Sequence, residues 1–599
     1  MPAAGWLDAG GYHSCAVLAG GSLRCWGRGF SGQLGYGNTG NVGDDETPAS
    51  VGPVSFGAGR TVKAIAAGNY HTCAILDDGS VRCWGFGGDG RLGYGNTNNV
   101  LDPSSVGPVY LGPARTATAI TAGAAHTCAI LDDGSVLCWG FGGGGFPFDG
   151  RLGYGNTHNV GDTAADTPGL IGPVNLGGHK AVAISAGGAH TCAILDDGSV
   201  RCWGIGAHGQ LGYGNSNDVG DTPTNTPNTV GPLNLGAGRT AVAISAGGAG
   251  SGSNSASSAV EHTCAILDNG SVRCWGYGGY GQLGYGNANN VGDTAATTPG
   301  KVGPVNLGRG RTARAISAGQ DHTCAVLDDG SVRCWGLGVD GRLGYPTLDR
   351  SGNQPNVGDT PATTPGKVGP VNLGRGRTAI AISAGGMHTC ARLDDGSVRC
   401  WGYGVDGQLG YCNTKNVGEI NTPGSVGPVN LTPGDLGARC APAINPRQLE
   451  AQRAHALRGC LAKVARRPRR QRPRAREACL TRYGRAPGRI TNLHVRAISS
   501  TEVLLTFAAP GSNGQNPPAA RAYLVKQSRQ PIHGVRGFLT AKALCNGYCR
   551  FKVTVVGTKI KLMINRLRPH TTYYYVIAAR DNVSGRLGSR SLTAQARTR

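Results

Sequence analysis

One histidine and two cysteines recur together seven times along the 599-residue chain, and they are the residues with the clearest capacity for chemistry. In the second copy, HTCAILDDGSVRCWG, they are His71, Cys73 and Cys83. Two cysteines can form a disulfide, or they can bind a metal ion together with the histidine. The backbone that positions them decides between these outcomes.

The segment between the two cysteines predicts a β-hairpin. Residues 77–79 (Asp-Asp-Gly) separate two short strands rich in apolar residues, the composition of a three-residue loop whose glycine takes the left-handed conformation. In the resulting antiparallel register, Ile75 faces Val81 and Cys73 faces Cys83. The cysteines then occupy positions without ladder hydrogen bonds, where Cα atoms lie about 4.5 Å apart, a separation compatible with a disulfide.

The same spacing recurs in every copy, so the sequence predicts seven equivalent disulfides. They join Cys15 with Cys25, Cys73 with Cys83, Cys128 with Cys138, Cys192 with Cys202, Cys264 with Cys274, Cys324 with Cys334 and Cys390 with Cys400. The remaining cysteines can pair as Cys412 with Cys440, Cys460 with Cys479 and Cys545 with Cys549. Such a pattern predicts an oxidising, extracellular or cell-surface location, although no export signal is visible in the opening MPAAGWLDAGG.

The alternative interpretation of the repeated residues is zinc. His71 and Cys73 share one face of their strand and Cys83 lies opposite, which would give three ligands and one open position. Paired Cys-x-x-Cys knuckles are absent, and seven identical zinc sites in one ring would be unusual. We therefore favour disulfides, interpret the histidines as hydrogen-bonding strand residues, and expect no cofactor or metal ion.

Three further patterns are better explained by structure than by chemistry. Gly85, Gly87 and Gly90 match a dinucleotide-binding pattern, but no helix pattern follows, and a phosphate site needs a helix N-terminus. Asx-turns and hydroxyl turns account for the loop aspartates that could bind calcium, Asp162, Asp221, Asp293 and Asp359. The seven tryptophans from Trp26 to Trp401 are expected in the core. Because the prominent His, Asp and Ser residues are equivalents within a repeat, we expect no catalytic site.

The elements that position these residues form a repeat of 55 to 72 residues, long enough for a small sheet with loops. Its anchors are His13, His71, His126, His190, His262, His322 and His388. Segments such as VGPVNLG, TAVAISAGG, HTCAIL and SVRCWG predict four strands in each copy. Seven such blades predict a seven-bladed β-propeller, and we expect Ser425–Leu431 to complete the blade that the N-terminal segment begins.

Within one copy, the patterns G-x-x-H-T, a D-G hairpin, V-x-x-W-G and G-Q-L-G-Y-G, or its variant GRLGYG, follow one another, as between Gly68 and Gly95. This combination resembles the repeat of the regulator of chromosome condensation family, whose fold is a seven-bladed β-propeller. The resemblance spans residues 1 to about 431 and implies an architecture rather than an activity. Founding members of that family are guanine-nucleotide exchange factors, so exchange on a small GTPase is the alternative function that the resemblance implies.

Charge divides the chain after Cys440. Of 57 basic and 35 acidic residues, 31 basic and 4 acidic ones follow that point, so the first part carries 26 − 31 = −5 and the last quarter 31 − 4 = +27. Affinity for an anionic polymer would therefore belong to the last quarter. The candidate contacts are Arg466, Arg467, Arg469, Arg470, Arg472 and Arg474. Nucleic acid is disfavoured as a partner because no aromatic residues interleave this run.

Three domains are expected, namely a propeller at 1–440, an Arg-rich, partly helical hinge at 441–486 and a β-sandwich at 487–599. The sandwich resembles a fibronectin type III domain. The residues that match its L-x-P-x-T-x-Y corner are Leu567, Pro569, Thr571 and Tyr573. Phe507 stands where this type of domain usually has an early core tryptophan.

Together these features predict an all-β, non-enzymatic binding scaffold. Its ligand is an unknown protein or polysaccharide, with an anionic envelope polymer as the expected partner of the basic region. No run of 18 apolar residues occurs, so we expect no membrane-spanning helix, and we expect a monomer.

Overall fold

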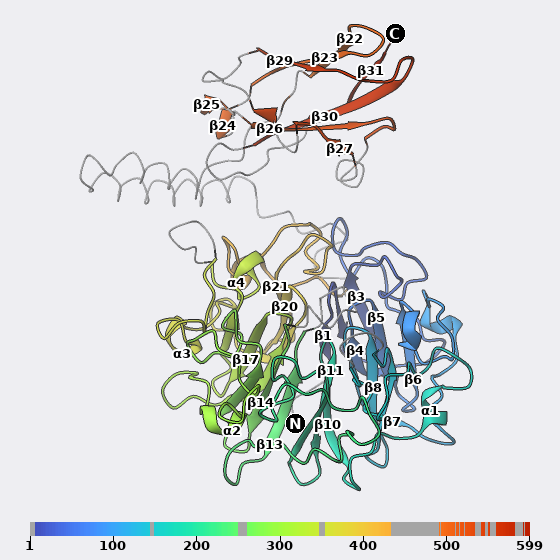
Figure 1. Ribbon diagram of the computed structural model, residues 1–599, viewed down its shortest axis with the longest axis vertical. Coiled ribbons are helices and arrows are strands. Elements are labelled where there is room, and N and C mark those ends of the chain that lie inside the picture. The colour runs from blue at the N-terminus through green and yellow to red at the C-terminus, as the bar shows by residue number, and fades with distance from the viewer. Residues whose placement is uncertain are drawn as a thin grey trace, which may run out of the picture. The chain divides into compact units, whose positions relative to one another are not determined.

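The computed structural model describes residues 6–143, 149–248, 260–346 and 354–432 in the first part of the chain. In the second part it describes residues 490, 493–509, 511–513, 516–519, 522–532, 541–545, 549–550, 559–580, 591 and 593–598. The chain forms two compact units, Met1–Ala443 and Ile444–Arg599 (Figure 1). None of the described helices is long and apolar enough to cross a membrane.

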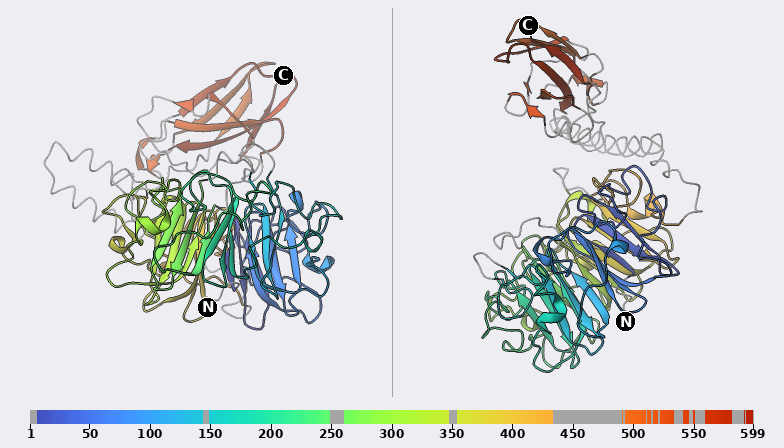
Figure 2. Two further views of the ribbon diagram at one scale, coloured as in Figure 1. Left: turned by 60° about the horizontal axis from the view of Figure 1, so that its bottom comes forward. Right: turned by 90° about the vertical axis from the view of Figure 1, so that its right-hand side faces the viewer.

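The first unit is a seven-bladed propeller, and each blade is a three-stranded antiparallel sheet within the described residues (Figure 2). The inner strands are β1 (Leu7–Ala9), β4 (Val62–Ala67), β7 (Ala117–Ala122), β10 (Ala181–Ala186), β13 (Ala241–Ala246), β16 (Ala313–Ala318) and β19 (Ala379–Ala384). The middle strands are β2 (His13–Val17), β5 (His71–Leu76), β8 (His126–Leu131), β11 (His190–Leu195), β14 (His262–Leu267), β17 (His322–Leu327) and β20 (His388–Leu393). The outer strands are β3 (Leu23–Gly27), β6 (Val81–Gly85), β9 (Val136–Gly140), β12 (Val200–Gly204), β15 (Val272–Gly276), β18 (Val332–Gly336) and β21 (Val398–Gly402).

Neighbouring inner strands contact each other, and β1 contacts β19, so the ring closes between blade 1 (β1–β3) and blade 7 (β19–β21). Short helices lie in the connections that follow the outer strands. They are η1 (Gly88–Gly90), η2 (Pro103–Ser105), α1 (Pro168–Ile171), α2 (Pro299–Val302), η4 (Val339–Gly341), α3 (Pro365–Val368) and α4 (Pro423–Val426).

The middle strands are the most deeply buried elements of each blade. All six residues of β5, β8, β11, β14 and β17 are buried, because a blade packs against a neighbour on each side. The buried side chains of all seven blades form one continuous cluster. The seven repeat tryptophans are fully enclosed in it, which confirms their core role.

The hairpin register is confirmed in the second blade, where Cys73 pairs with Cys83 and Ile75 with Val81. The expected fourth strand is wrong. The segment VGPVNLG contributes a single backbone bond to its blade, as from Val109 N to Val81 O, because its proline lacks a ladder donor. Tyr94 covers the free edge instead, since its hydroxyl accepts from Cys83 N at 3.0 Å and donates to Cys83 O at 3.1 Å.

The expected closure by the last segment is also wrong. Val429 N donates to Val398 O, so residues 425–431 belong to blade 7, and blade 1 is built from N-terminal residues alone. Each VGPVNLG-type segment bonds to the outer strand that precedes it in the chain, so the last segment stays with blade 7 and does not complete blade 1. Blades 1 and 7 are joined by loop backbone bonds, such as that from Ala49 N to Asn430 O, and by side-chain bonds from Trp26 Nε1 to Gln408 O and from Ala9 N to Ser383 Oγ.

The second unit is a sandwich of two main sheets. One contains β22 (His494–Ala497), β23 (Val503–Ala508) and β29 (Lys559–Ile564), and the other contains β26 (Ala522–Ser528), β27 (Lys542–Ala543), β28 (Cys549–Arg550), β30 (Thr572–Arg580) and β31 (Ala594–Arg597). A small hairpin joins β24 (Gly511–Asn513) and β25 (Asn516–Ala519). Phe507 packs edge-on against Tyr523 in the core, and Tyr573 Oη accepts from Arg568 N at 3.0 Å, as a tyrosine corner requires.

Replacing Ser14 tests how the ring closes. Ser14 Oγ is buried, lies 2.7 Å from His388 Nε2 of blade 7 and donates to Gln408 O. Because Ser14→Ala leaves two buried polar groups without this partner, we expect the free energy of unfolding in urea to fall by about 1–3 kcal/mol. Ser14→Thr is the matched control, since threonine fills the equivalent position in the other six blades. Equal stability of the alanine and threonine variants would contradict this account of closure.

Candidate functional site

The repeat cysteines lie at the centre of each blade. In the structure a disulfide joins the two cysteines of every hairpin, and all fourteen side chains are inaccessible to solvent. Cys545 is joined to Cys549 in the second unit. Cys440, Cys460 and Cys479 lie outside the described residues, so the pairings of Cys412 with Cys440 and of Cys460 with Cys479 stay predictions.

The repeat histidines connect neighbouring blades. His71 Nε2 lies 2.9 Å from Thr127 Oγ1, and that hydroxyl donates to Arg91 O, so the imidazole is the donor to the hydroxyl. The same contact recurs around the whole ring at 2.7–2.9 Å. The pairs are His13–Thr72, His71–Thr127, His126–Thr191, His190–Thr263, His262–Thr323, His322–Thr389 and His388–Ser14. The histidines are thus hydrogen-bonding strand residues, as expected, and the cysteines bond each other.

These imidazoles are held neutral. The second ring nitrogen, Nδ1, has no hydrogen-bond partner in six of the seven histidines within the described structure. Burial therefore lowers the pKa of His262 to about 3, because a proton on Nδ1 would be an uncompensated buried charge. The pKa values of His71, His126 and His322 are lowered well below 6.5 for the same reason.

The exception is His190, which faces a buried carboxyl group. Its Nδ1 lies 2.7 Å from Glu261 Oε2, and its Nε2 contacts Thr263 Oγ1 at 2.8 Å. His190 is therefore the repeat histidine whose Nδ1 has a carboxyl partner, and this pair breaks the sevenfold chemical symmetry of the ring.

The solvent-accessible positions that differ among the blades lie on one face of the propeller, which we call the turn face. Here each inner strand turns into its middle strand, and here each outer strand ends. In every blade the amide after Trp-Gly donates to the carbonyl before the histidine, as Phe86 N does to Tyr70 O. The turn-face rim comprises the side chains at these two positions and in the loop that follows. The opposite face carries the Asp-Asp-Gly hairpins.

Aromatic and basic side chains pack against each other along this rim. Tyr12 stacks on Tyr70 with ring centroids 5.6 Å apart, and the Arg28 guanidinium lies 5.0 Å from the Tyr12 centroid. Arg91 lies in the same way over Phe86, at 4.8 Å. Arginine stacked on an aromatic ring is a recurring feature of protein interfaces.

Four exposed apolar side chains lie on consecutive blades of the rim. Val339 of blade 6, Val405 of blade 7, Phe30 of blade 1 and Phe86 of blade 2 all follow an outer strand. Phe30 is 72% exposed and the others are 37–45% exposed. We call these four residues the apolar arc. The sequence analysis missed the arc, since it is assembled from loops of four different copies. The sequence feature that could have revealed the arc is the change of residue type at these loop positions between copies whose strands are nearly identical.

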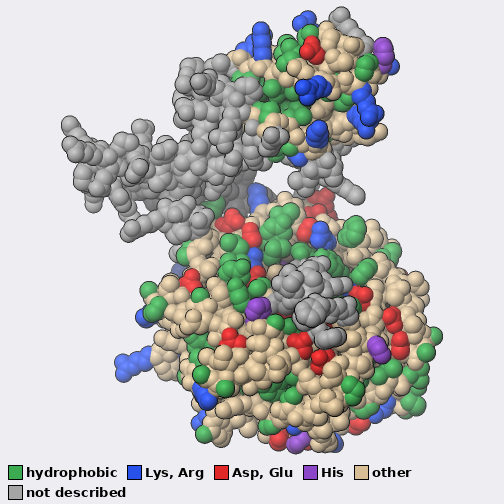
Figure 3. Space-filling view, in the orientation of Figure 1, with side chains coloured by type: hydrophobic (Ala, Val, Ile, Leu, Met, Phe, Trp, Pro, Cys, Tyr) green, Lys and Arg blue, Asp and Glu red, His purple; other side chains and the backbone are tan. Residues whose placement is uncertain are grey.

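The rim also carries carboxyl groups whose pKa values are shifted toward neutrality. Burial raises the pKa of Asp321 to about 6, against the opposing effect of Arg342, whose Nη1 lies 3.6 Å away. Burial raises the pKa of Asp218 to about 7. Around the propeller surface seen in Figure 3, hydrophobic, acidic and basic side chains are intermingled, and no single sign of charge dominates.

Three further candidate sites came from the sequence, namely the loop aspartates, the glycine motif and the arginine run. The loop aspartates accept hydrogen bonds within their own loops, for example Asp293 from Thr297 Oγ1 at 3.0 Å and Asp221 from Asn225 Nδ2 at 3.1 Å. Gly90 has a φ of +73°, and the short η1 turn contains no helix N-terminus for a phosphate, which supports a turn role for this motif. The six arginines from Arg466 to Arg474 lie outside the described residues, and their contact with an anionic polymer stays a prediction.

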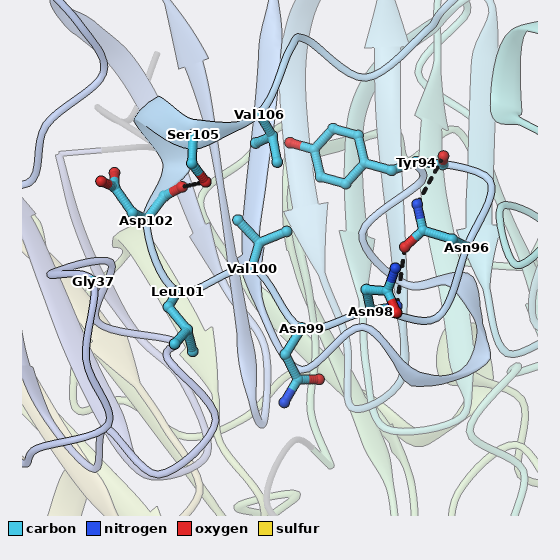
Figure 4. Close-up of a pocket in the computed structure, with 10 residues that line it drawn as sticks. All are labelled: Gly37, Tyr94, Asn96, Asn98, Asn99, Val100, Leu101, Asp102, Ser105 and Val106. Carbon is cyan, nitrogen blue, oxygen red and sulfur yellow. Dashed lines mark hydrogen bonds between the residues drawn. The ribbon is translucent and has the colours of Figure 1, made fainter.

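Figure 4 shows a hollow between the outer loops of blades 1 and 2. Asn96 accepts from Asn98 N at 3.0 Å and donates to Tyr94 O at 3.2 Å, and Ser105 Oγ donates to Asp102 O. The polar groups of this hollow are thus used by their own turns. We find no ligand-directed group among them and regard the rim as the stronger candidate site.

Comparisons with known proteins agree on the repeat. The family model described as the regulator of chromosome condensation (RCC1) repeat matches residues 7–33, 62–91, 117–145, 181–210, 260–282, 313–342 and 379–408. A second model with this description matches residues 21–75 and 78–130.

Two curated relatives illustrate the range of similar proteins. The ultraviolet-B receptor UVR8 of Arabidopsis thaliana is 28% identical over 411 residues, which cover 67% of this chain and 78% of the receptor. The human E3 ubiquitin-protein ligase HERC2 is 29% identical over 400 residues, but these cover only 7% of the ligase and 66% of this chain.

Two solved structures are similar to parts of this chain. Prp20p from Saccharomyces cerevisiae, studied for its binding to Gsp1p and histones, aligns with a TM-score of 0.49 and 20% identity over 67% of this chain and 85% of that chain. The FN5 domain of Drosophila Lar aligns at 23% identity with a TM-score of 0.12, over 19% of this chain and 97% of that domain.

A pH series on His262→Gln tests whether the buried imidazoles stay neutral. The folded-state pKa of His262 is about 3 and the unfolded value about 6.5, so its neutral form favours the native state fully above pH 6.5. Below pH 6.5 the unfolded chain binds the proton and this stability is lost. Glutamine does not titrate. We therefore expect the stability difference between wild type and variant to shrink by about 2–3 kcal/mol from pH 7.5 to pH 4.5 in urea titrations.

The control for this series is His158→Gln, which changes an exposed histidine. This variant gives the effect of a histidine-to-glutamine change at the surface, against which the pH series of His262→Gln is judged. A difference for His262→Gln that is no more dependent on pH than that of the control would show that the ring imidazole titrates in the folded state.

Proposed function

Because residues 7–408 carry seven RCC1 repeats, we propose that this chain is a non-enzymatic scaffold that binds a protein partner through its turn-face rim, outside the reducing interior of the cell. The observation that carries the proposal is one enclosed disulfide at the same place in every blade. Such bonds form and persist in extracellular and cell-surface proteins and are rare in the cytosol.

The composition of the rim supports a protein as the partner. Aromatic and arginine side chains contribute a large share of the binding free energy in protein interfaces. Here Tyr12, Arg28 and Tyr70 are already stacked before any partner binds, so little side-chain entropy would be lost. The apolar arc lies in loops carried by the rigid blades, the usual position of binding residues on a repeat scaffold.

Intact mass measurement tests the compartment. We expect the purified chain, denatured without a reductant, to react with no thiol reagent, and full reduction of ten disulfides to add twenty hydrogens, two for each bridge. Complete alkylation of the denatured chain without a reductant would overturn the extracellular part of the proposal. A smaller mass increase would show that fewer than ten disulfides are present, and peptide mapping would then identify the missing pairs.

Surface variants test the rim. We expect Arg28→Ala combined with Phe30→Ala and Phe86→Ala to weaken capture of a specific extracellular protein at least tenfold, measured by quantitative mass spectrometry on the immobilised chain. Val182→Ala with Val242→Ala is the matched control, because these valines are 62% and 56% exposed and begin inner strands near the opposite face. Equal loss in both variants would argue against the rim. Accelerated nucleotide release from a small GTPase would instead support the exchange-factor alternative.

A further inference from the structure

The hairpins on the opposite face of the propeller hold a positively charged side chain at the same position in several blades. In five blades an arginine from the segment before the inner strand forms ion pairs with the aspartates of the hairpin in the same blade. These are Arg60 with Asp77 and Asp78, Arg115 with Asp132 and Asp133, Arg239 with Asp268, Arg311 with Asp328 and Asp329, and Arg377 with Asp394 and Asp395. The guanidinium compensates two adjacent carboxylates in four of these blades.

Blade 4 has the carboxylates but not the guanidinium. Its hairpin keeps Asp196 and Asp197, and His179 stands in place of the arginine. His179 Nδ1 lies 3.0 Å from Asp196 Oδ1 and 3.9 Å from Asp197 Oδ2. The imidazole donates one hydrogen bond here, and unlike a guanidinium it can release that proton and offer the nitrogen lone pair to a metal ion.

The backbone holds these three side chains together. Asp196 N donates to Lys180 O, which fixes the chain beside His179 against the hairpin. Asp197 Oδ1 accepts from Ser199 N at 2.9 Å, which orients its carboxylate and leaves Oδ2 toward the histidine. The methylene stem of Lys180 packs over Gly134 of blade 3. The site is therefore preformed by the hairpin.

The spacing of the donor atoms suits a small divalent metal. One ligand atom from each of the three residues lies within 4.8 Å of the others. Tetrahedral zinc with bonds of about 2.0–2.2 Å places its ligand atoms roughly 3.4 Å apart, so small rotations of the side chains would suffice. The side chains are 38–48% exposed, which gives a metal ion access and leaves room for water as the fourth ligand.

The chemistry of the donors selects among metals. Zinc binds both imidazole nitrogen and carboxylate oxygen, whereas calcium takes six to eight oxygen ligands and does not use imidazole.

We propose that His179, Asp196 and Asp197 form a surface zinc site, in which a metal ion takes the place that arginine fills in the other blades. This site lies on the face opposite the rim, and it stands independently of the proposed protein-binding function. Within the described residues, blade 4 differs from the other Asp-Asp hairpins in carrying His179 and Lys180 where they carry arginine and threonine.

Calorimetric titration of zinc chloride into the full-length chain, without a histidine tag and after dialysis against a chelator, tests the proposal. We expect His179→Arg to lower the affinity of one site at least tenfold, because it removes a ligand and restores the arginine of the other blades. Asp197→Asn should do the same while an amide oxygen still accepts from Ser199 N. Unchanged affinity and stoichiometry in both variants would overturn the proposal.

The repeat provides a matched gain-of-function control. Arg311 of blade 6 pairs with both Asp328 and Asp329, and these side chains are 35–37% exposed, close to the values in blade 4. We expect Arg311→His to raise the stoichiometry by one zinc ion per chain. Thermal unfolding of each variant confirms that it is folded, and a folded Arg311→His variant with no added site would contradict the claim that the carboxylate pair and the histidine are sufficient.

Discussion

The propeller depends on seven hydrogen bonds between a buried imidazole and a hydroxyl of the next blade. Each bond fixes the distance between two middle strands, and the last one, from His388 to Ser14, joins the two ends of the repeat. Because the hydroxyl donates its own hydrogen bond to a backbone carbonyl, each histidine must present Nε2–H to that hydroxyl. A blade that lost this geometry would leave buried polar groups unpaired in two blades at once.

This constraint explains why chemistry is confined to the surface. The histidine, the hydroxyl, the two cysteines and the tryptophan of a blade are all buried, and each is used for contacts within the blade or with its neighbour. The disulfide then closes the hairpin directly beside the imidazole. Residues that make no such buried contact lie at the ends of the strands, and they are the ones that differ among the copies. The rim and the Arg-Asp positions of the hairpins both lie at these strand ends.

Much of the interior could be predicted from the sequence, because local rules determine it. A three-residue Asp-Asp-Gly loop sets the register, and the register sets which residue Cys73 must face. The fourth strand and the closure could not be predicted, since both depend on which ladder bonds a proline-containing segment can still make. The apolar arc was missed for a different reason. Phe30 and Val405 are 375 residues apart in sequence, and only the ring brings their loops onto neighbouring blades.

Because the blades share nearly the same backbone, a residue that differs at one position can be compared directly with its equivalents in the other blades. The position before the repeat histidine holds Tyr12 in blade 1, Glu261 in blade 5 and Asp321 in blade 6 on nearly the same backbone. A difference in behaviour among these blades therefore reports the side chain rather than the fold. Glu261 gives the Nδ1 atom of His190 a carboxyl partner, and Asp321 brings a carboxyl with a pKa of about 6 to the rim. Since the shared scaffold supplies the stability, single positions are free to acquire charge, aromatic surface or metal ligands without loss of the ring.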